Sequence, residues 1–144
     1  ELKMTSLIGS IKAYLESYSG LKANAPVWVD LLGVNPGQYA VIPLPGTRIV
    51  EKYIDGSSLR EFPFAVQSVE STSDELERLE IHGFFEALGD WFESQTEAGT
   101  LPTLSANKTP ESIEVTSWAF LYEQGVSDKG IYQVQCKLVY KQSA

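Results

Sequence analysis

Residues 49–70, "IVEKYIDGSSLREFPFAVQSVE", decide the fold because two strand-like segments flank a turn-forming pair. Asp55-Gly56 is a dipeptide that supplies positive φ in a tight turn, so we expect residues 47–54 and 59–70 to form a hairpin. Pro63 has no N–H to donate and cannot sit in a sheet with both neighbouring strands bonded to it. The sequence therefore predicts that the second strand is an edge strand, or bulged, at Pro63, where another molecule could pair with it.

Apolar residues at helical spacing mark one segment on each side of this hairpin. Residues 4–18 carry a one-faced apolar stripe, and Gly20 stands where such a helix would stop. From Ser71 the period is again helical, with Thr72 and Glu75 as a capping box. The second helix has a broad apolar stripe suited to lying across a sheet, formed by Ile81, Phe84, Phe85, Leu88, Trp91 and Phe92. We expect Phe85 and Leu88 to be core residues.

A narrower stripe lies on a different side of the second helix. It is made of Leu76, Leu79, Gly83 and Ala87, and its small residues would let another helix approach closely. We expect it to pack against helix 4–18 of the same subunit, and contact with a second subunit is the alternative.

The remaining strands are predicted at 39–44, 112–124 and 130–142, while "VWVDLL" at 27–32 is left unassigned between a strand and a helical turn. The last strand alternates apolar and polar residues, which indicates one buried and one solvated face. In 112–124 the apolar residues change parity after Val115, which predicts a β-bulge near Thr116 or Ser117.

These elements predict an α+β fold: a two-layer sandwich in which a mostly antiparallel five-stranded sheet carries two helices on one face. Its 144 residues, 43% of them hydrophobic, fit a single domain over residues 1–144. No apolar run approaches the roughly 18 residues of a membrane helix. We expect a soluble protein that is not exported and has no membrane partner.

The net charge of −8 is concentrated in residues 70–97, which hold nine acids against Arg78. In the rest of the chain the acidic residues and the lysines and arginines are equal in number. Because a phosphate-binding surface needs clustered lysine and arginine, this distribution argues against sequence-specific nucleic-acid binding. A solvated helix face is the simpler interpretation, and a negative surface for a partner is the other.

Candidate catalytic groups are few. His82 is the only histidine and is expected to be partly exposed and structural, and Cys136 is expected to be a buried, apolar-like thiol. Glu86, Asp90 and Glu93 run down one helix and suit a divalent ion poorly without ligands from elsewhere. The sequence therefore predicts no catalytic residue, no cofactor and no metal site, and a protein that is not an enzyme.

Four strings resemble a known family. They are "YIDGSSLREFPFAV" (53–66), "GFFEALGDWFESQTEAGTLPTL" (83–104), "IEVTSWAFLY" (113–122) and "YQVQCKLVY" (132–140). They are similar to small minor capsid proteins of long-tailed bacteriophages, which are themselves similar to tail terminators. The resemblance covers most of the chain, in order and with the same spacings.

The resemblance implies a non-enzymatic structural protein of the virion, located at the tail or neck and assembled in the host cytoplasm. It implies a ring of copies of this chain, with a hexamer as the expected form, that caps the tail tube and joins the tail to the head. The expected partners are the tail-tube protein and the head–tail connector protein, with DNA passing through the ring. Another head–tail completion protein is a variant of the same interpretation.

A ring protein contacts its neighbours through rims and strand edges, so the hairpin tip at 55–60 and the loop at 98–111 are candidate contact regions. The predicted interface residues are Asp55, Arg60, Leu101, Pro102 and Lys108. Two alternatives of other classes are a small-ligand-binding module with a pocket beneath Trp28, Trp91 and Trp118, and a hydrolase that uses His82.

Overall fold

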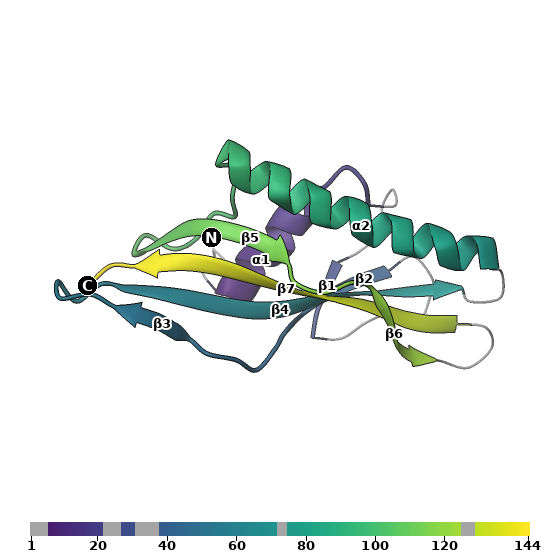
Figure 1. The fold of residues 1–144 in the computed structure, drawn as a ribbon, viewed down its shortest axis with the longest axis horizontal. Helices are drawn as coiled ribbons and strands as arrows, with labels where there is room; N and C mark the ends of the chain where they lie inside the picture. The colour runs from purple at the N-terminus through teal and green to yellow at the C-terminus, as the bar shows by residue number, and fades with distance from the viewer. Residues whose placement is uncertain (1–5, 22–26, 31–37, 72–74, 125–128) are drawn as a thin grey trace, which may run out of the picture.

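The computed structural model describes residues 6–21, 27–30, 38–71, 75–124 and 129–144, which form an α+β fold with two helices and seven strands (Figure 1). The elements are α1 (Leu7–Glu16), β1 (Val27–Val29), β2 (Gln38–Pro43), β3 (Ile49–Lys52), β4 (Ser58–Ser71), α2 (Glu75–Ala98), β5 (Lys108–Val115), β6 (Phe120–Gln124) and β7 (Lys129–Gln142). Within these residues, neither helix combines the length and apolarity that a membrane crossing requires.

The centre of the sheet is a long antiparallel ribbon of β4 and β7. The two strands pair without interruption from Ser58–Gln142 to Ser71–Lys129. At about 3.3 Å per residue, 14 paired residues reach about 46 Å. In Figure 1 this ribbon runs the full length of the molecule, from the β3–β4 hairpin to the end that carries β6.

The prediction was an edge strand, or a bulge, at Pro63, but β4 as a whole is not an edge strand and its pairing with β7 has no register shift at Pro63. β7 pairs with one side of β4, and β2 and β3 share its other side. Pro63 is tolerated because it lies opposite the chain between β2 and β3, where its carbonyl accepts a hydrogen bond from the Leu44 N–H at 3.0 Å. The backbone N and O of one strand residue point to the same neighbouring strand. The missing N–H of Pro63 therefore faces the gap between β2 and β3, where no strand needs it as a donor.

The hairpin prediction at Asp55-Gly56 is confirmed. Tyr53 accepts a hydrogen bond from the Gly56 N–H at 3.0 Å and donates its own N–H to Ser57 at 2.9 Å. Gly56 has φ +91°, which is strained for any residue with a Cβ. This is a three-residue loop in which a type I turn is followed by a glycine bulge.

The five-stranded, mostly antiparallel sheet is corrected to a seven-stranded mixed sheet within the described residues. β1 is part of the unassigned segment "VWVDLL" and pairs in parallel with β2. The predicted strand 112–124 is split into β5 and β6, which both pair with β7. Four residues separate Val115 from Phe120, whereas only two separate their partners on β7, Cys136 and Gln133. This irregularity is larger than the single bulge expected at Thr116 or Ser117.

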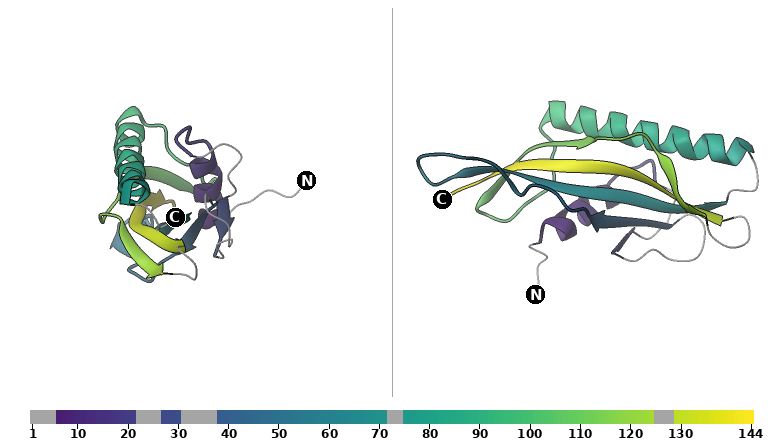
Figure 2. Two further views of the ribbon diagram at one scale, coloured as in Figure 1. Left: turned by 90° about the vertical axis from the view of Figure 1, so that its right-hand side faces the viewer. Right: turned by 60° about the horizontal axis from the view of Figure 1, so that its bottom comes forward.

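Both helices lie on one face of the sheet, as predicted, because they contribute to one buried cluster (Figure 2). From α2 it takes Phe85 and Leu88, which are 2% and 0% exposed, so their prediction as core residues is confirmed. α1 meets α2 through Tyr14, whose ring centroid lies 5.0 Å from that of Trp91. The sheet contributes the even-numbered residues of β4 and β7 that face the helices, such as Phe64, Val66, Val134, Cys136 and Leu138.

The ends of the helices are only partly described. α1 begins after Ser6, whose hydroxyl accepts a hydrogen bond from the Gly9 N–H at 3.1 Å. The predicted start of this helix at residue 4 and the capping residue Thr72 fall outside the described residues.

Candidate functional site

One end of the sheet brings together three segments that are far apart in the sequence. Ser58 and Lys108 both pair with Gln142, and the Ser143 N–H donates to the Asn107 carbonyl at 2.9 Å. The β3–β4 turn, the 105–108 turn and the C-terminal residues therefore form one rim, here called the hairpin end. Figure 1 shows it beyond the end of α2.

Three of the five predicted interface residues lie at this hairpin end. Asp55 is exposed in the turn and accepts hydrogen bonds from the hydroxyl of Ser57 at 2.6 Å and from its N–H at 2.9 Å. These bonds lower the pKa of Asp55. Arg60 donates from Nε to Ser58 at 2.9 Å, and Lys108 donates from Nζ to Ser105 at 3.2 Å.

The other two predicted interface residues are elsewhere. Leu101 is partly buried against the core, and Pro102 is buried. The adjacent Thr100 carbonyl accepts a hydrogen bond from the Tyr14 hydroxyl at 2.8 Å, which fastens this loop to α1. The loop is thus folded onto its own chain, and the role of Leu101 and Pro102 in a subunit contact stays a prediction.

The hairpin end also presents an apolar side chain that the sequence analysis did not single out. Ile54 is fully exposed at the tip of the turn. Beside it, Tyr53 is partly exposed, with Lys141 Nζ 5.3 Å from its ring centroid. The sequence contained a sign of this exposure: Ile54 is a large aliphatic residue in a turn, where small or polar residues are favoured. We call Tyr53 and Ile54 the apolar tip.

A second exposed apolar surface lies at and before β6, near the opposite end of the sheet (Figure 1). Trp118 is 80% exposed, and the other exposed large side chains there are Phe120, Leu121 and Tyr122. The run "WAFLY" does not alternate, so both sides of this edge strand are apolar. Contiguous exposed apolar residues on a soluble protein are typical of interaction sites.

Trp118 forms one wall of a groove between α2 and the segment that joins β5 to β6, here called the α2–β6 groove. Its apolar lining is Phe85, Gly89, Val115, Trp118, Ala119 and Val134. Gly89 lies beside Val115 of β5, and a Cβ at position 89 would meet that side chain at an ordinary contact distance of 3.6 Å. Three exposed acids of α2 also line the groove: Glu86, Asp90 and Glu93.

The stripe of Leu76, Leu79, Gly83 and Ala87 does not pack against α1 as expected. Leu76 and Leu79 are each 62% exposed, and a Cβ at Gly83 would meet nothing within 4 Å. The neighbouring side of α2 is contacted instead by Tyr14 of α1, which meets Trp91, and by Tyr18 just after α1, which meets Phe84 and Trp91. The stripe is therefore on the outer surface of the folded chain.

The tryptophan pocket that would serve a small ligand is not formed as hypothesised. Trp91 packs between the helices, with its ring centroid 4.6 Å from that of Tyr18. Trp28 and Trp118 belong to opposite edges of the sheet, since β1 is separated from β5 and β6 by β2, β4 and β7. Three intervening strands at about 4.8 Å spacing keep these two side chains apart.

The candidate catalytic groups are separated as well. His82 is exposed on α2, and its ring meets Tyr132 edge-on with centroids 5.6 Å apart. Cys136 is buried in the core, as expected, and its burial raises the pKa of the thiol well above the ordinary range. Among the described residues, no cluster of three histidine, cysteine or acidic side chains could hold a metal ion.

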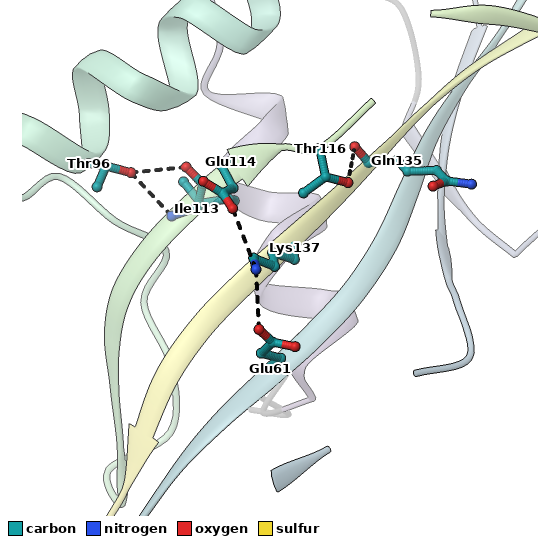
Figure 3. A network of polar contacts seen from close by, with 7 residues as sticks. All are labelled: Glu61, Thr96, Ile113, Glu114, Thr116, Gln135 and Lys137. Atoms are coloured by element: carbon teal, nitrogen blue, oxygen red, sulfur yellow. Dashed lines mark hydrogen bonds and ion pairs between the residues drawn. The ribbon is translucent and has the colours of Figure 1, made fainter. Parts of the chain in front are cut away.

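Polar contacts tie the edge of the sheet to its neighbours (Figure 3). The Thr96 hydroxyl of α2 donates to the Ile113 carbonyl at 3.0 Å and accepts from the Ile113 N–H at 3.1 Å. On the outer face, Lys137 lies 3.2 Å from Glu61 and 3.6 Å from Glu114. The hydrogen bond to Glu61 raises the pKa of Lys137. These contacts hold β4, β5, β7 and α2 together.

Comparison with models of known protein families and with curated proteins gives no match to this chain.

Proposed function

We propose that this protein is a non-enzymatic assembly protein of a long-tailed bacteriophage, which caps the tail tube and joins it to the head connector as a ring of identical subunits. The observation that carries the proposal is the pair of different apolar surfaces near opposite ends of the sheet. One is the apolar tip with Tyr53 and Ile54, and the other surrounds Trp118 at and before β6.

Two different surfaces are what a ring requires. A cyclic assembly of more than two subunits is built from a head-to-tail contact, in which one patch of each subunit meets a different patch of the next. Exposing large apolar side chains to water is unfavourable in free energy. Two such patches on a small domain therefore favour binding of partners that bury them. The similarity of residues 53–66, 83–104, 113–122 and 132–140 to phage minor capsid proteins supports the same function.

The proposed location is the neck of the virion, with assembly in the host cytoplasm. The tail-tube protein and the head–tail connector are the proposed partners, and the six-subunit ring is part of the proposal. The exposed stripe of Leu76 and Leu79 and the acidic surface of α2 supply further area for these partners.

The test is tail assembly with and without this chain, with the other tail proteins present. The proposal predicts tails of uniform length that attach to heads when the chain is supplied, and overlong or headless tails when it is omitted. Electron microscopy gives the length distribution. An unchanged distribution and normal head attachment without the chain would refute the proposal.

A further inference from the structure

We infer that Asp55-Gly56 is a modification site, where the chain forms isoaspartate by way of a succinimide, and that Ser57 keeps this reaction slow while the β3–β4 turn is closed. The inference does not depend on the proposed function, although the modified turn carries the apolar tip. Asp55-Gly56 is the only Asp-Gly or Asn-Gly pair in the sequence.

The reaction needs no reagent other than water. The backbone nitrogen of Gly56 attacks Cγ of Asp55, so that a C–N bond forms and the carboxyl hydroxyl leaves as water with the amide proton. Water then opens the succinimide ring at either carbonyl. Opening at the former backbone carbonyl of Asp55 leaves Gly56 bonded to Cγ, which is isoaspartate. Because one water leaves and one returns, the product has the mass of the original chain.

The first argument is access to the two reacting groups. Asp55 and Gly56 are both exposed at the hairpin end, so water reaches them (Figure 1). Glycine has no Cβ, and no side chain beside the attacking nitrogen hinders its approach to Cγ of Asp55.

The second argument is that the closed turn engages both groups. The Gly56 N–H donates to the Tyr53 carbonyl at 3.0 Å, which retains the proton that the nitrogen must lose. The Asp55 carboxylate accepts from the Ser57 N–H at 2.9 Å and from the Ser57 hydroxyl at 2.6 Å. These two bonds lower the pKa of Asp55, and an ionised carboxyl has no hydroxyl to release as water. The reaction is therefore slow until the turn opens.

The third argument is that the turn can open without unfolding of the core. β3 has three residue pairs with β4 and, among the described strands, no other partner. Most of β3 is exposed, while β4 remains paired with β7 from Ser58 onward. Short exposed segments open at a much lower free energy than the core does. The folded chain therefore reaches the reactive form through this local opening.

Isoaspartate changes the turn in which it forms. It places Cβ of Asp55 in the main chain and converts the side-chain carboxylate into an α-carboxylate. The lengthened main chain cannot keep the geometry of the bond between the Gly56 N–H and the Tyr53 carbonyl. We therefore expect the turn that fixes Tyr53 and Ile54 to loosen with age.

The test is the rate of isoaspartate formation in the whole chain at neutral pH and physiological temperature. Trypsin releases residues 53–60, which follow Lys52 and end at Arg60, as one peptide. Its isoaspartate form has the same mass, separates chromatographically and accepts a labelled methyl group from an isoaspartate methyltransferase. The reference is the synthetic peptide 53–60, which lacks the rest of the sheet. Isoaspartate should form in the folded chain at least about tenfold more slowly than in the peptide, and at a measurable rate.

Variants of the turn test the role of Ser57. Ser57→Ala should raise the rate in the folded chain about three- to tenfold, because the hydroxyl bond to the carboxylate is lost. Ser57→Thr keeps the hydroxyl and should behave like the wild type. The matched control is Ser143→Ala, which removes a hydroxyl of the same hairpin end that bonds to Asn107 instead of Asp55. It should leave the rate unchanged, and Asp55→Glu should abolish the modified peptide.

Three results would overturn the inference. Equal rates in the folded wild type and the peptide would show that the closed turn gives no protection. Equal rates in folded Ser57→Ala and Ser143→Ala would show that Ser57 does not control the reaction. No isoaspartate in the folded chain over the time in which the peptide converts would show that the folded protein has no such site. Thermal unfolding identifies the variants that fold, and the comparison of the wild type with the peptide needs no variant.

Discussion

The two sides of α2 contain similar apolar residues and have opposite environments. Phe85 and Leu88 are enclosed by the sheet, whereas Leu76 and Leu79 face outward and are mostly exposed. The enclosed residues account for the fold of the subunit. The exposed ones, together with Ile54 and Trp118, do not, and we propose that they serve contacts between molecules. Apolar character alone therefore does not tell a buried residue from an exposed one.

The largest expected effect is on the enclosed side. Phe85→Ala should lower the free energy of unfolding by about 3–5 kcal/mol, because it leaves a cavity between α2 and the sheet. The matched change on the outer side, Leu79→Ala, should alter it by less than about 0.5 kcal/mol. Chemical denaturation measures both. Similar losses from the two variants would mean that the two sides of α2 do not differ as described.

The polar link between α2 and β5 should have a smaller effect. Thr96→Val removes the hydroxyl that bonds both the N–H and the carbonyl of Ile113, so it should cost about 1–2 kcal/mol. Thr96→Ser keeps the hydroxyl and serves as the control. If the valine and serine variants unfold at the same denaturant concentration, the link does not stabilise the subunit.

Burial of Cys136 predicts a loss of stability in alkali. The folded state holds the thiol proton because burial raises its pKa, while the unfolded chain releases it above about pH 8.5. The folded state then binds more protons, so the free energy of unfolding falls with rising pH, by up to about 1.4 kcal/mol per pH unit. Cys136→Ala should show a shallower alkaline slope. An identical slope in the two proteins would exclude this thiol as the cause.

The smallest effect belongs to the exposed ion pairs. Lys137→Met removes the contacts with Glu61 and Glu114 on the outer face and should cost no more than about 1 kcal/mol. The difference from wild type should shrink in high salt, because salt screens charges at the surface. A larger cost that salt does not change would show that Lys137 acts through packing instead.

Much of the fold was predictable because local chemistry and tertiary packing agree. Asp55-Gly56 required a turn, and the helical spacing of Phe85 and Leu88 required a buried face. Pro63 was misinterpreted because a proline needs only a gap on its own side of the strand, and the sequence does not show that two short strands, β2 and β3, share that side. The parallel pairing of β1 with β2 could not be predicted either, because a strand of three residues is too short to show an alternation of apolar and polar residues.

The candidate site was harder to predict than the fold. The hairpin tip was identified as a rim, but the loop composition does not reveal that Pro102 is buried or that the adjacent Thr100 carbonyl is bonded to Tyr14 of α1. The exposure of Trp118 depends on the four residues that separate β5 from β6, where the parity of the strand is lost. Strand parity sets which side a residue faces, so one irregularity changes the exposure of every residue after it.

The most direct test of the account compares Ile54→Ser with Leu88→Ala in two measurements, the free energy of unfolding and self-association by sedimentation. The account predicts that Ile54→Ser leaves unfolding unchanged and reduces self-association at least tenfold, while Leu88→Ala lowers the free energy of unfolding by about 2–5 kcal/mol. A stable Ile54→Ser protein that associates as strongly as the wild type would contradict the claim that the exposed apolar tip exists for assembly.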